Sequence, residues 1–298
     1  MTFLALTLVV IGQTPTGATE ATNPLYQTIL EKGLVAGGVT VKLAPPILRA
    51  GQTEADRRAA LKAVITQPMD EFLRDSVNAP FQLRVRDVPY PGGLIREVDL
   101  WFAIHANLDE INLDDLAGKK DQASHAEAGN MSFSIRTLTD PELKIPLKSL
   151  PGIIDRHVVS KAVLLDRIEV TTINHVSASK TSGAVLFASM TDPAYSEGGS
   201  LSNRWLPLAR PGEKAEVGSP RTYEGSVAYS RVSPISEKPS ILLVESHLAF
   251  AEPKGWFNGT AILRSKLGLI AQDQVRQLRR EMISRRKKDA KTALPAKL

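Results

Sequence analysis

The chain contains no cysteine. This absence excludes disulfide bonds, thiolate metal sites and a cysteine nucleophile. It also excludes the cysteine through which a bacterial lipoprotein carries its lipid. Any catalytic or metal-binding site must therefore be built from other residue types.

Long hydrophobic runs are also missing. The run from Phe3 to Ile11 is far shorter than the ~20 residues that a membrane-spanning helix needs. Small and polar residues follow it, with two small-x-small cleavage patterns that end at Ala18 and Ala21. We therefore predict a secretory signal over residues 1–21 and a soluble exported protein, periplasmic or extracellular. A basic start is absent, and a buried N-terminal strand is the alternative.

The familiar catalytic and nucleotide-binding motifs are absent. The sequence has no G-x-S-x-G elbow, no phosphate-binding or dinucleotide-binding glycine loop and no H-E-x-x-H helix. The stretch from Asn107 to Asp114 has a calcium-like composition but lacks the required glycine and spacing. We therefore predict no cofactor and assign no metal ligands.

The positive charge is concentrated at the C-terminus. Residues 276–298 hold nine Lys or Arg and two Asp or Glu, which leaves 28 of the 37 basic and 30 of the 32 acidic residues for the rest of the chain. This basic segment is a candidate contact for an anionic surface such as lipid or cell-wall polymer. Nucleic acid is not favoured, because its binders usually spread basic residues over a folded face. The simpler interpretation is a solvated helix end whose charges complement the helix dipole. The residues concerned are Arg276, Arg279, Arg280, Arg285, Arg286, Lys287 and Lys288.

The clearest structural pattern runs from Ser240 to Lys288. Residues 241–250 alternate in a way that predicts a central antiparallel strand. Residues 269–288 predict a long amphipathic helix, about 30 Å in length. Its apolar stripe predicts that the helix covers the apolar face of a sheet. The stripe consists of Leu267, Ala271, Val275, Leu278 and Met282.

The remaining elements predict an α+β fold. A short helix pair is expected over 54–66 and 69–77, followed by strands joined mostly by short turns, which favours a mostly antiparallel sheet. We expect a single domain over 22–288, with a frayed basic tail over 289–298. Long loops are expected at 118–130 and 191–222. The strands are expected at 39–43, 81–86, 94–105, 131–138, 162–176, 183–190, 223–232 and 241–250.

The order of a helix pair, antiparallel strands and a long C-terminal helix across residues 50–288 resembles the helix-grip lipid-binding domains of the START type. In that family a curved sheet wraps a long helix and leaves a cavity between them. The resemblance implies an apolar or lipid ligand. It rests on element order and carries over no residues, and the 191–222 stretch departs from the family's compact pattern.

Two strands place acidic and imidazole side chains on a polar face. Asp99 and His105 share one face of the strand 94–105, and Glu245 and His247 share one face of the strand 241–250. If these strands are neighbours, the four side chains could serve general acid–base chemistry or hold a divalent metal. The simpler interpretation is a solvated sheet face. Aromatic candidates for ligand contact are Trp101, Trp205 and Trp256, although packing is the more usual role of Trp256.

Three classes of function therefore stay open. The first is an exported, non-catalytic module that binds an apolar or anionic ligand. The second is an exported hydrolase or metal-dependent enzyme that uses Asp99, His105, Glu245 and His247. The third is a structural or assembly protein of the cell envelope that makes contact through its basic tail.

Overall fold

The computed structural model describes residues 23–111, 124–127, 131–147, 150–196, 198–208, 219–235, 240–257 and 261–292. For residues 124–127, 261 and 287–292 it describes the backbone alone. The expected signal at 1–21 lies outside these ranges, and so does most of the tail expected at 289–298.

The largest structural unit of the described chain is one antiparallel sheet of 11 strands, so the predicted α+β class is confirmed. The main path through the sheet runs β3-β4-β13-β12-β9-β8-β7-β6-β5, and β8 also pairs with β10, which pairs with β11. The strands are β3 (Gln82–Tyr90), β4 (Gly93–His105), β5 (Ser124–Glu127), β6 (Met131–Thr137), β7 (Ile153–Leu164), β8 (Ile168–Lys180), β9 (Val185–Thr191), β10 (Arg204–Pro207), β11 (Arg221–Thr222), β12 (Ser226–Pro234) and β13 (Ile241–Pro253).

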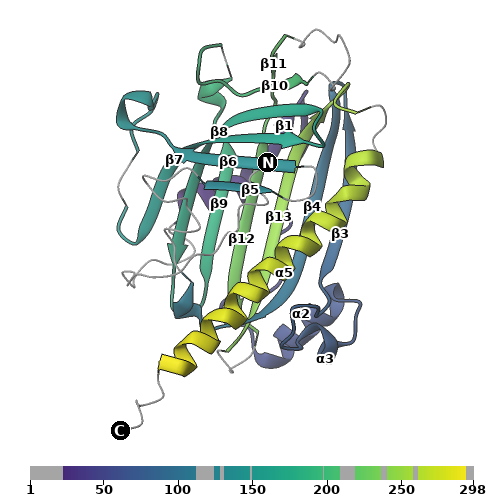
Figure 1. The fold of residues 1–298 in the computed structure, drawn as a ribbon, viewed down its shortest axis with the longest axis vertical. Helices are drawn as coiled ribbons and strands as arrows, with labels where there is room; N and C mark the ends of the chain where they lie inside the picture. Colours follow the sequence, from purple (N-terminus) through teal and green to yellow (C-terminus); the bar gives the residue numbers. More distant parts are fainter. Residues whose placement is uncertain are drawn as a thin grey trace.

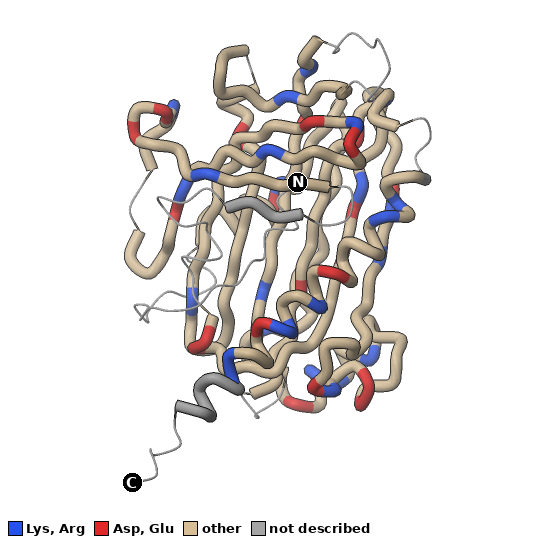
Figure 2. Tube along the Cα trace, in the orientation of Figure 1, with Lys and Arg blue, Asp and Glu red and all other residues tan. Residues whose placement is uncertain are grey.

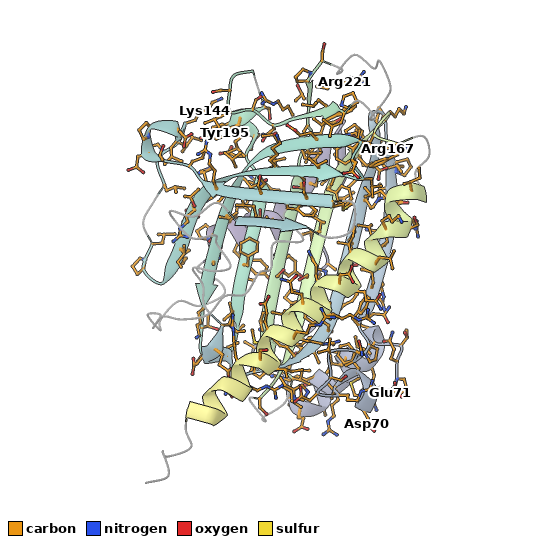
Figure 3. The ribbon with its side chains drawn as sticks, viewed as in Figure 1. Asp70, Glu71, Lys144, Arg167, Tyr195 and Arg221 are labelled. Atoms are coloured by element: carbon orange, nitrogen blue, oxygen red, sulfur yellow. The ribbon has the colours of Figure 1, made fainter. Side chains whose placement is uncertain are left out.

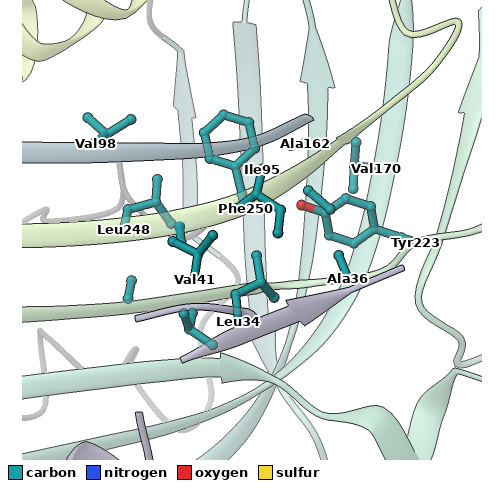
Figure 4. Packing of buried hydrophobic residues seen from close by; sticks show 14 of the residues in the cluster. Leu34, Ala36, Val41, Ile95, Val98, Ala162, Val170, Tyr223, Leu248 and Phe250 are labelled. Atoms are coloured by element: carbon teal, nitrogen blue, oxygen red, sulfur yellow. The ribbon is translucent and has the colours of Figure 1, made fainter. Parts of the chain in front are cut away.

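The sheet curls around the long C-terminal helix α5 (Ala261–Thr292). Figure 1 shows α5 crossing the front of β4, β12 and β13 diagonally, while β5 and β6 run across the front above it. Side chains of β6 to β8 belong to the same apolar cluster as side chains of β4 and β13, so the two parts of the curl share a core. Figure 4 shows this junction, with Phe250 and Ile95 near Ala162 and Val170.

We call the side of the sheet that contacts α5 the inner face. Leu100 and Phe102 of β4 and Leu242 and Val244 of β13 lie on it, as alternation predicts. The five residues of the predicted helix stripe are all buried, and four of them belong to the same apolar cluster as these strand residues, namely Ala271, Val275, Leu278 and Met282. The expectation that the helix covers an apolar sheet face is therefore confirmed. The helix begins earlier than predicted, at Ala261.

The opposite side, which we call the outer face, is covered by the N-terminal elements. Helix α1 (Pro24–Lys32) packs on β8, β9 and β12, and the hairpin of β1 (Leu34–Ala36) and β2 (Val39–Val41) contacts β13. Helices α2 (Glu54–Val64) and α3 (Met69–Phe72) place Leu61 and Phe72 against Trp101 and Leu243. Thr53 caps the N-terminus of α2 and forms a capping box with Asp56.

The structure divides the expected strand 162–176 differently. Strand β7 ends at Leu164 and β8 begins at Ile168, with Leu165 and Asp166 in the left-handed region at φ 51° and 54°. Two left-handed central residues make a tight hairpin turn that usually carries Asn or Gly. Since neither residue is present there, the expected strand was drawn through the turn. Strand β7 begins at Ile153, nine residues before the start of the expected strand.

The expected loops also contain structure. Residues 191–222 include a short 3₁₀ turn (Pro193–Tyr195), β10 and β11. Residues 118–130 include β5, and the rest of that stretch lies outside the described residues. Strands of two to four residues are too short to show alternation, so sequence patterns miss them. None of the helices in the described ranges is both long and apolar enough to cross a membrane.

Candidate functional site

The polar groups predicted on β4 and β13 lie on neighbouring strands of the outer face. The register aligns Asp99, His247 and Tyr229 in one row across β4, β13 and β12. The next row consists of Trp101, Glu245 and Arg231. Because these strands pair directly, side chains in each row are cross-strand neighbours.

Asp99 and His247 form the closest pair in these rows. The Asp99 carboxylate lies 2.6 Å from Nδ1 of His247. The His247 ring stacks on Tyr229 and meets Trp101 edge to face. His247 is fully buried, and its Nε2 has no hydrogen-bond partner among the described residues. The imidazole is therefore packed on both sides instead of being open to a substrate.

Glu245 of β13 binds the backbone of residues 47–48 to the sheet through hydrogen bonds. Its carboxylate accepts hydrogen bonds from the backbone N–H groups of Ile47 at 2.8 Å and Leu48 at 3.3 Å. In the neighbouring row, the Tyr229 hydroxyl donates to the carbonyl of Ala44. Burial raises the pKa of Glu245, although these hydrogen bonds and the nearby charges of His247 and Arg231 oppose that rise. The polar face is thus buried beneath residues 44–48, unlike the solvated face that alternation alone indicates.

His105 does not join the other candidates. It lies opposite Ile241, six positions along β4 from Asp99, and its Nε2 is 2.8 Å from the carbonyl oxygen of Leu73. Within the described ranges, no group of three or more His, Asp or Glu side chains is arranged to hold a metal ion. The structure therefore brings together Asp99, Glu245 and His247 and leaves His105 at the end of the strand.

A second imidazole cluster lies on β7 and β8, and the sequence did not indicate it. His157 and His175 are cross-strand partners whose rings stack with centroids 4.9 Å apart. His157 bonds Asp192 at 2.8 Å, and His175 bonds Asp155 at 2.6 Å. Burial alone would raise the pKa of Asp192, but hydrogen bonds from His157 and the Ala194 backbone leave it below its usual value. The register of β7 against β8 brings the two imidazoles together, and this register is not evident from the sequence.

The three tryptophans are all buried. Trp101 lies beside His247 in the outer-face rows. Trp205 and Trp256 pack edge to face, and Trp256 also stacks on Tyr223. The predicted packing role of Trp256 agrees with this position. None of the three offers an open aromatic surface.

The most unusual charged group is Arg279 of α5, which is only 5% exposed. Its guanidinium donates to three backbone carbonyls, Ala103 of β4 at 3.0 Å, Pro80 at 3.2 Å and Ala79. An arginine has five N–H donors, so two stay available for other acceptors. Burial lowers the pKa of Arg279 to about 10, which leaves the group charged at neutral pH.

A pocket of about 170 Å³ lies between α5 and the segment 77–81. Arg276 and Arg279 line it, and no carboxylate is among its described lining residues. Asn78 and Gln272 add uncharged polar groups to the lining, and its other residues are apolar. The apolar lining comes from Val77, Ala79, Pro80, Phe81 and Val275.

The other basic residues of α5 have different environments. Arg286 forms a two-pronged ion pair with Asp75, with both N–O distances at 2.8 Å. Arg280 is exposed, and the side chains of Lys287 and Lys288 lie outside the described residues. Figure 2 shows acidic residues interspersed with the basic ones along the described part of the helix. The described helix is thus not a uniform cationic surface, and the pocket at Arg276 and Arg279 is the distinctive basic feature.

No protein-family model matches this sequence, and the search of curated proteins finds no match. The function of this chain is therefore inferred from the geometry of its own residues.

Proposed function

We propose that this protein is an exported, non-catalytic module that binds a small anionic ligand in the pocket between α5 and residues 77–81. The observation that carries the proposal is the pairing of Arg276 with the buried Arg279 in a pocket whose described lining includes no carboxylate. A buried cation without a neutralising carboxylate favours an anion at its side.

The size of the pocket selects the kind of ligand. Sites for drug-sized or lipid-like molecules usually enclose about 300–1,000 Å³. A volume of about 170 Å³ fits a phosphate or carboxylate group with a short apolar substituent. Val275, which lines the pocket, and its neighbour Leu278 are buried in the apolar interface between α5 and the sheet. We therefore favour the anionic form of the binding hypothesis over the apolar one.

The enzyme hypothesis has weaker support. Glu245 and His247 are fully buried, and neither they nor Asp99 line the pocket beside α5. The Glu245 carboxylate is already engaged with the backbone of Ile47 and Leu48. General acid–base catalysis needs a group within hydrogen-bond reach of the substrate proton. These residues instead stabilise the fold through contacts within the chain.

Calorimetric titration of the full chain with inorganic phosphate and with phenyl phosphate tests the proposal. We expect saturable binding of phenyl phosphate, and no binding of phenol, because the two arginines recognise the charge. The Arg276→Gln variant is expected to weaken binding about 10- to 150-fold, since a hydrogen bond to a charged group contributes about 1.5–3 kcal/mol.

Arg280→Gln is the matched control, because Arg280 is exposed on the same helix and does not line the pocket. It should retain wild-type affinity. Equal losses in both variants would indicate unspecific attraction to the basic helix and would overturn the assignment. So would the absence of saturable binding by the wild-type protein.

A further inference from the structure

The pocket between α5 and residues 77–81 has a second chemical feature besides its two arginines. Its lining also includes two side-chain amides, Asn78 and Gln272, together with apolar groups from both walls. Figure 3 shows α3, labelled by Asp70 and Glu71, at the lower end of the molecule, and residues 77–81 lead from this helix to β3. A ligand of this pocket therefore meets charged, amide and apolar groups together.

The α5 wall of the pocket is a single face of the helix. Gln272, Arg276 and Arg279 follow one another at spacings of four and three residues, which places them on one side of a helix. One helical turn, about 5.4 Å, separates the backbone of Gln272 from that of Arg276. Successive residues of an extended chain are about 3.5 Å apart. Side chains as flexible as these can therefore bind two successive polar groups of one ligand chain.

Burial gives the pocket an inner and an outer end. Arg279 is buried, with its guanidinium held by three backbone carbonyls. Arg276 and Gln272 are half-buried, and Asn78 is exposed. A charge is bound most strongly where water is excluded. The charged group of a ligand is therefore expected at the buried end, and the chain attached to it leads past the amides toward solvent.

The residue types select a ligand that combines a carboxylate with an amide. An amide side chain carries both a donor and an acceptor, which complement the acceptor and donor of a peptide group. Guanidinium groups pair with carboxylate oxygens, frequently through two parallel hydrogen bonds. Phe81 and Val275 line opposite walls and provide apolar contacts for a short aliphatic side chain. The volume of about 170 Å³ is below that of a site for a drug-sized molecule and suits one amino-acid residue.

We propose that this pocket binds an N-acylated α-amino acid with a free carboxylate, which is the chemistry of the C-terminal residue of a peptide. The carboxylate pairs with Arg276 and Arg279. The adjoining amide bonds to Gln272 and Asn78, and the aliphatic side chain packs on Phe81. Capture of a chain end through its carboxylate is a recurring mode of peptide recognition. This ligand class rests on the proposed function, because it names the anion that the same pocket binds.

Calorimetric titration of the full chain with matched small molecules tests the ligand class. N-acetylleucine carries the carboxylate, the amide and the side chain, whereas 4-methylpentanoate lacks the amide and N-acetylleucinamide lacks the charge. We expect N-acetylleucine to bind about fivefold more tightly than 4-methylpentanoate, the effect of hydrogen bonds between neutral groups. N-acetylleucinamide should bind at least about tenfold more weakly than N-acetylleucine, because it offers the arginines no carboxylate.

The peptide Ala-Ala-Leu distinguishes the two sources of this chemistry. Affinity equal to that of N-acetylleucine identifies the end of a peptide as the ligand. Weaker binding identifies a free acylated amino acid.

A substitution on α5 tests the role of the amide. Gln272→Leu should weaken binding of N-acetylleucine about fivefold and leave 4-methylpentanoate unchanged, because it removes the amide and keeps both arginines. Gln277→Leu is the matched control, since Gln277 is exposed on the same helix and does not line the pocket. It should bind N-acetylleucine as the wild type does. Thermal unfolding of both variants confirms that they are folded.

Equal affinity of the wild type for N-acetylleucine and 4-methylpentanoate would overturn this ligand class. So would a loss of affinity that is the same for Gln272→Leu and Gln277→Leu. A protein that binds phenyl phosphate but shows no preference for the amide contradicts the ligand class alone. A protein that binds none of these anions contradicts the proposed function itself.

Discussion

At the scale of single residues, the main feature of the outer face is a group of buried ionisable side chains. Glu245, Arg231 and His247 are all buried, and Arg231 lies opposite Glu245 in the register. Their positions are fixed by hydrogen bonds to backbone and by stacking on Tyr229. Removing one member leaves the others buried without their partner, which is costly.

Glu245 gives a pH-dependent prediction. Because burial raises its pKa in the folded state above the value of 4.5 expected in the unfolded chain, the folded state binds the proton more tightly. Its favourable contribution is complete below pH 4.5 and is lost as the pH rises through the raised pKa. The unfolding free energy of Glu245→Gln should therefore increase relative to wild type over this window.

Urea unfolding of both proteins from pH 4 to pH 8 measures this difference. Glu31→Gln, on the exposed side of α1, controls for the carboxamide substitution itself. A difference between wild type and Glu245→Gln that stays constant or shrinks as the pH rises would contradict the role of burial.

At the scale of elements, α5 shows most clearly what a sequence pattern predicts. The spacing of its five apolar residues predicted the buried stripe, because the helical period is fixed by backbone geometry. The same pattern did not predict that Arg279 would be buried. Its burial depends on the carbonyls of Ala79, Pro80 and Ala103, which come from distant parts of the chain.

The stripe supplies a stability prediction with an internal control. Leu278 is buried against the inner face, and Leu269 on the same helix is 55% exposed. Leu278→Ala should lower the unfolding free energy by about 2–5 kcal/mol, since it removes a side chain and leaves a cavity. Leu269→Ala should change it by less than about 0.5 kcal/mol. Urea unfolding of the two variants measures both, and comparable effects would argue against the observed helix packing.

At the scale of the whole molecule, the two sides of the sheet are covered by opposite ends of the described chain. The N-terminal elements pack on the outer face and α5 packs on the inner face. Asn23 is buried, caps α1 by accepting from the Tyr26 backbone, and donates to Ser179 of β8 at 3.2 Å. Asn23, the first described residue, is therefore already attached to the sheet.

This anchoring bears on the proposed export. Cleavage after Ala18 or Ala21 would leave Asn23 in place, whereas a cut beyond it would remove the cap of α1. We expect the full chain, produced in a bacterial host with a secretory pathway, to be recovered outside the cytoplasm with Thr19 or Thr22 as its first residue. Intact mass spectrometry of the purified protein measures this, and a cytoplasmic product that retains residues 1–18 would contradict the export proposal.

The sequence by itself determined the α+β class, the alternating faces of β4 and β13 and the apolar stripe of α5. These features depend on local periods of two residues in strands and 3.6 residues in helices, and both periods are visible in the sequence. Tertiary structure alone decided which polar groups meet. Strand register paired Asp99 with His247 and His157 with His175, and the packing of α5 beside residues 77–81 placed Arg279 at its pocket. Register and helix packing arise from contacts between distant segments, and the local pattern does not encode them.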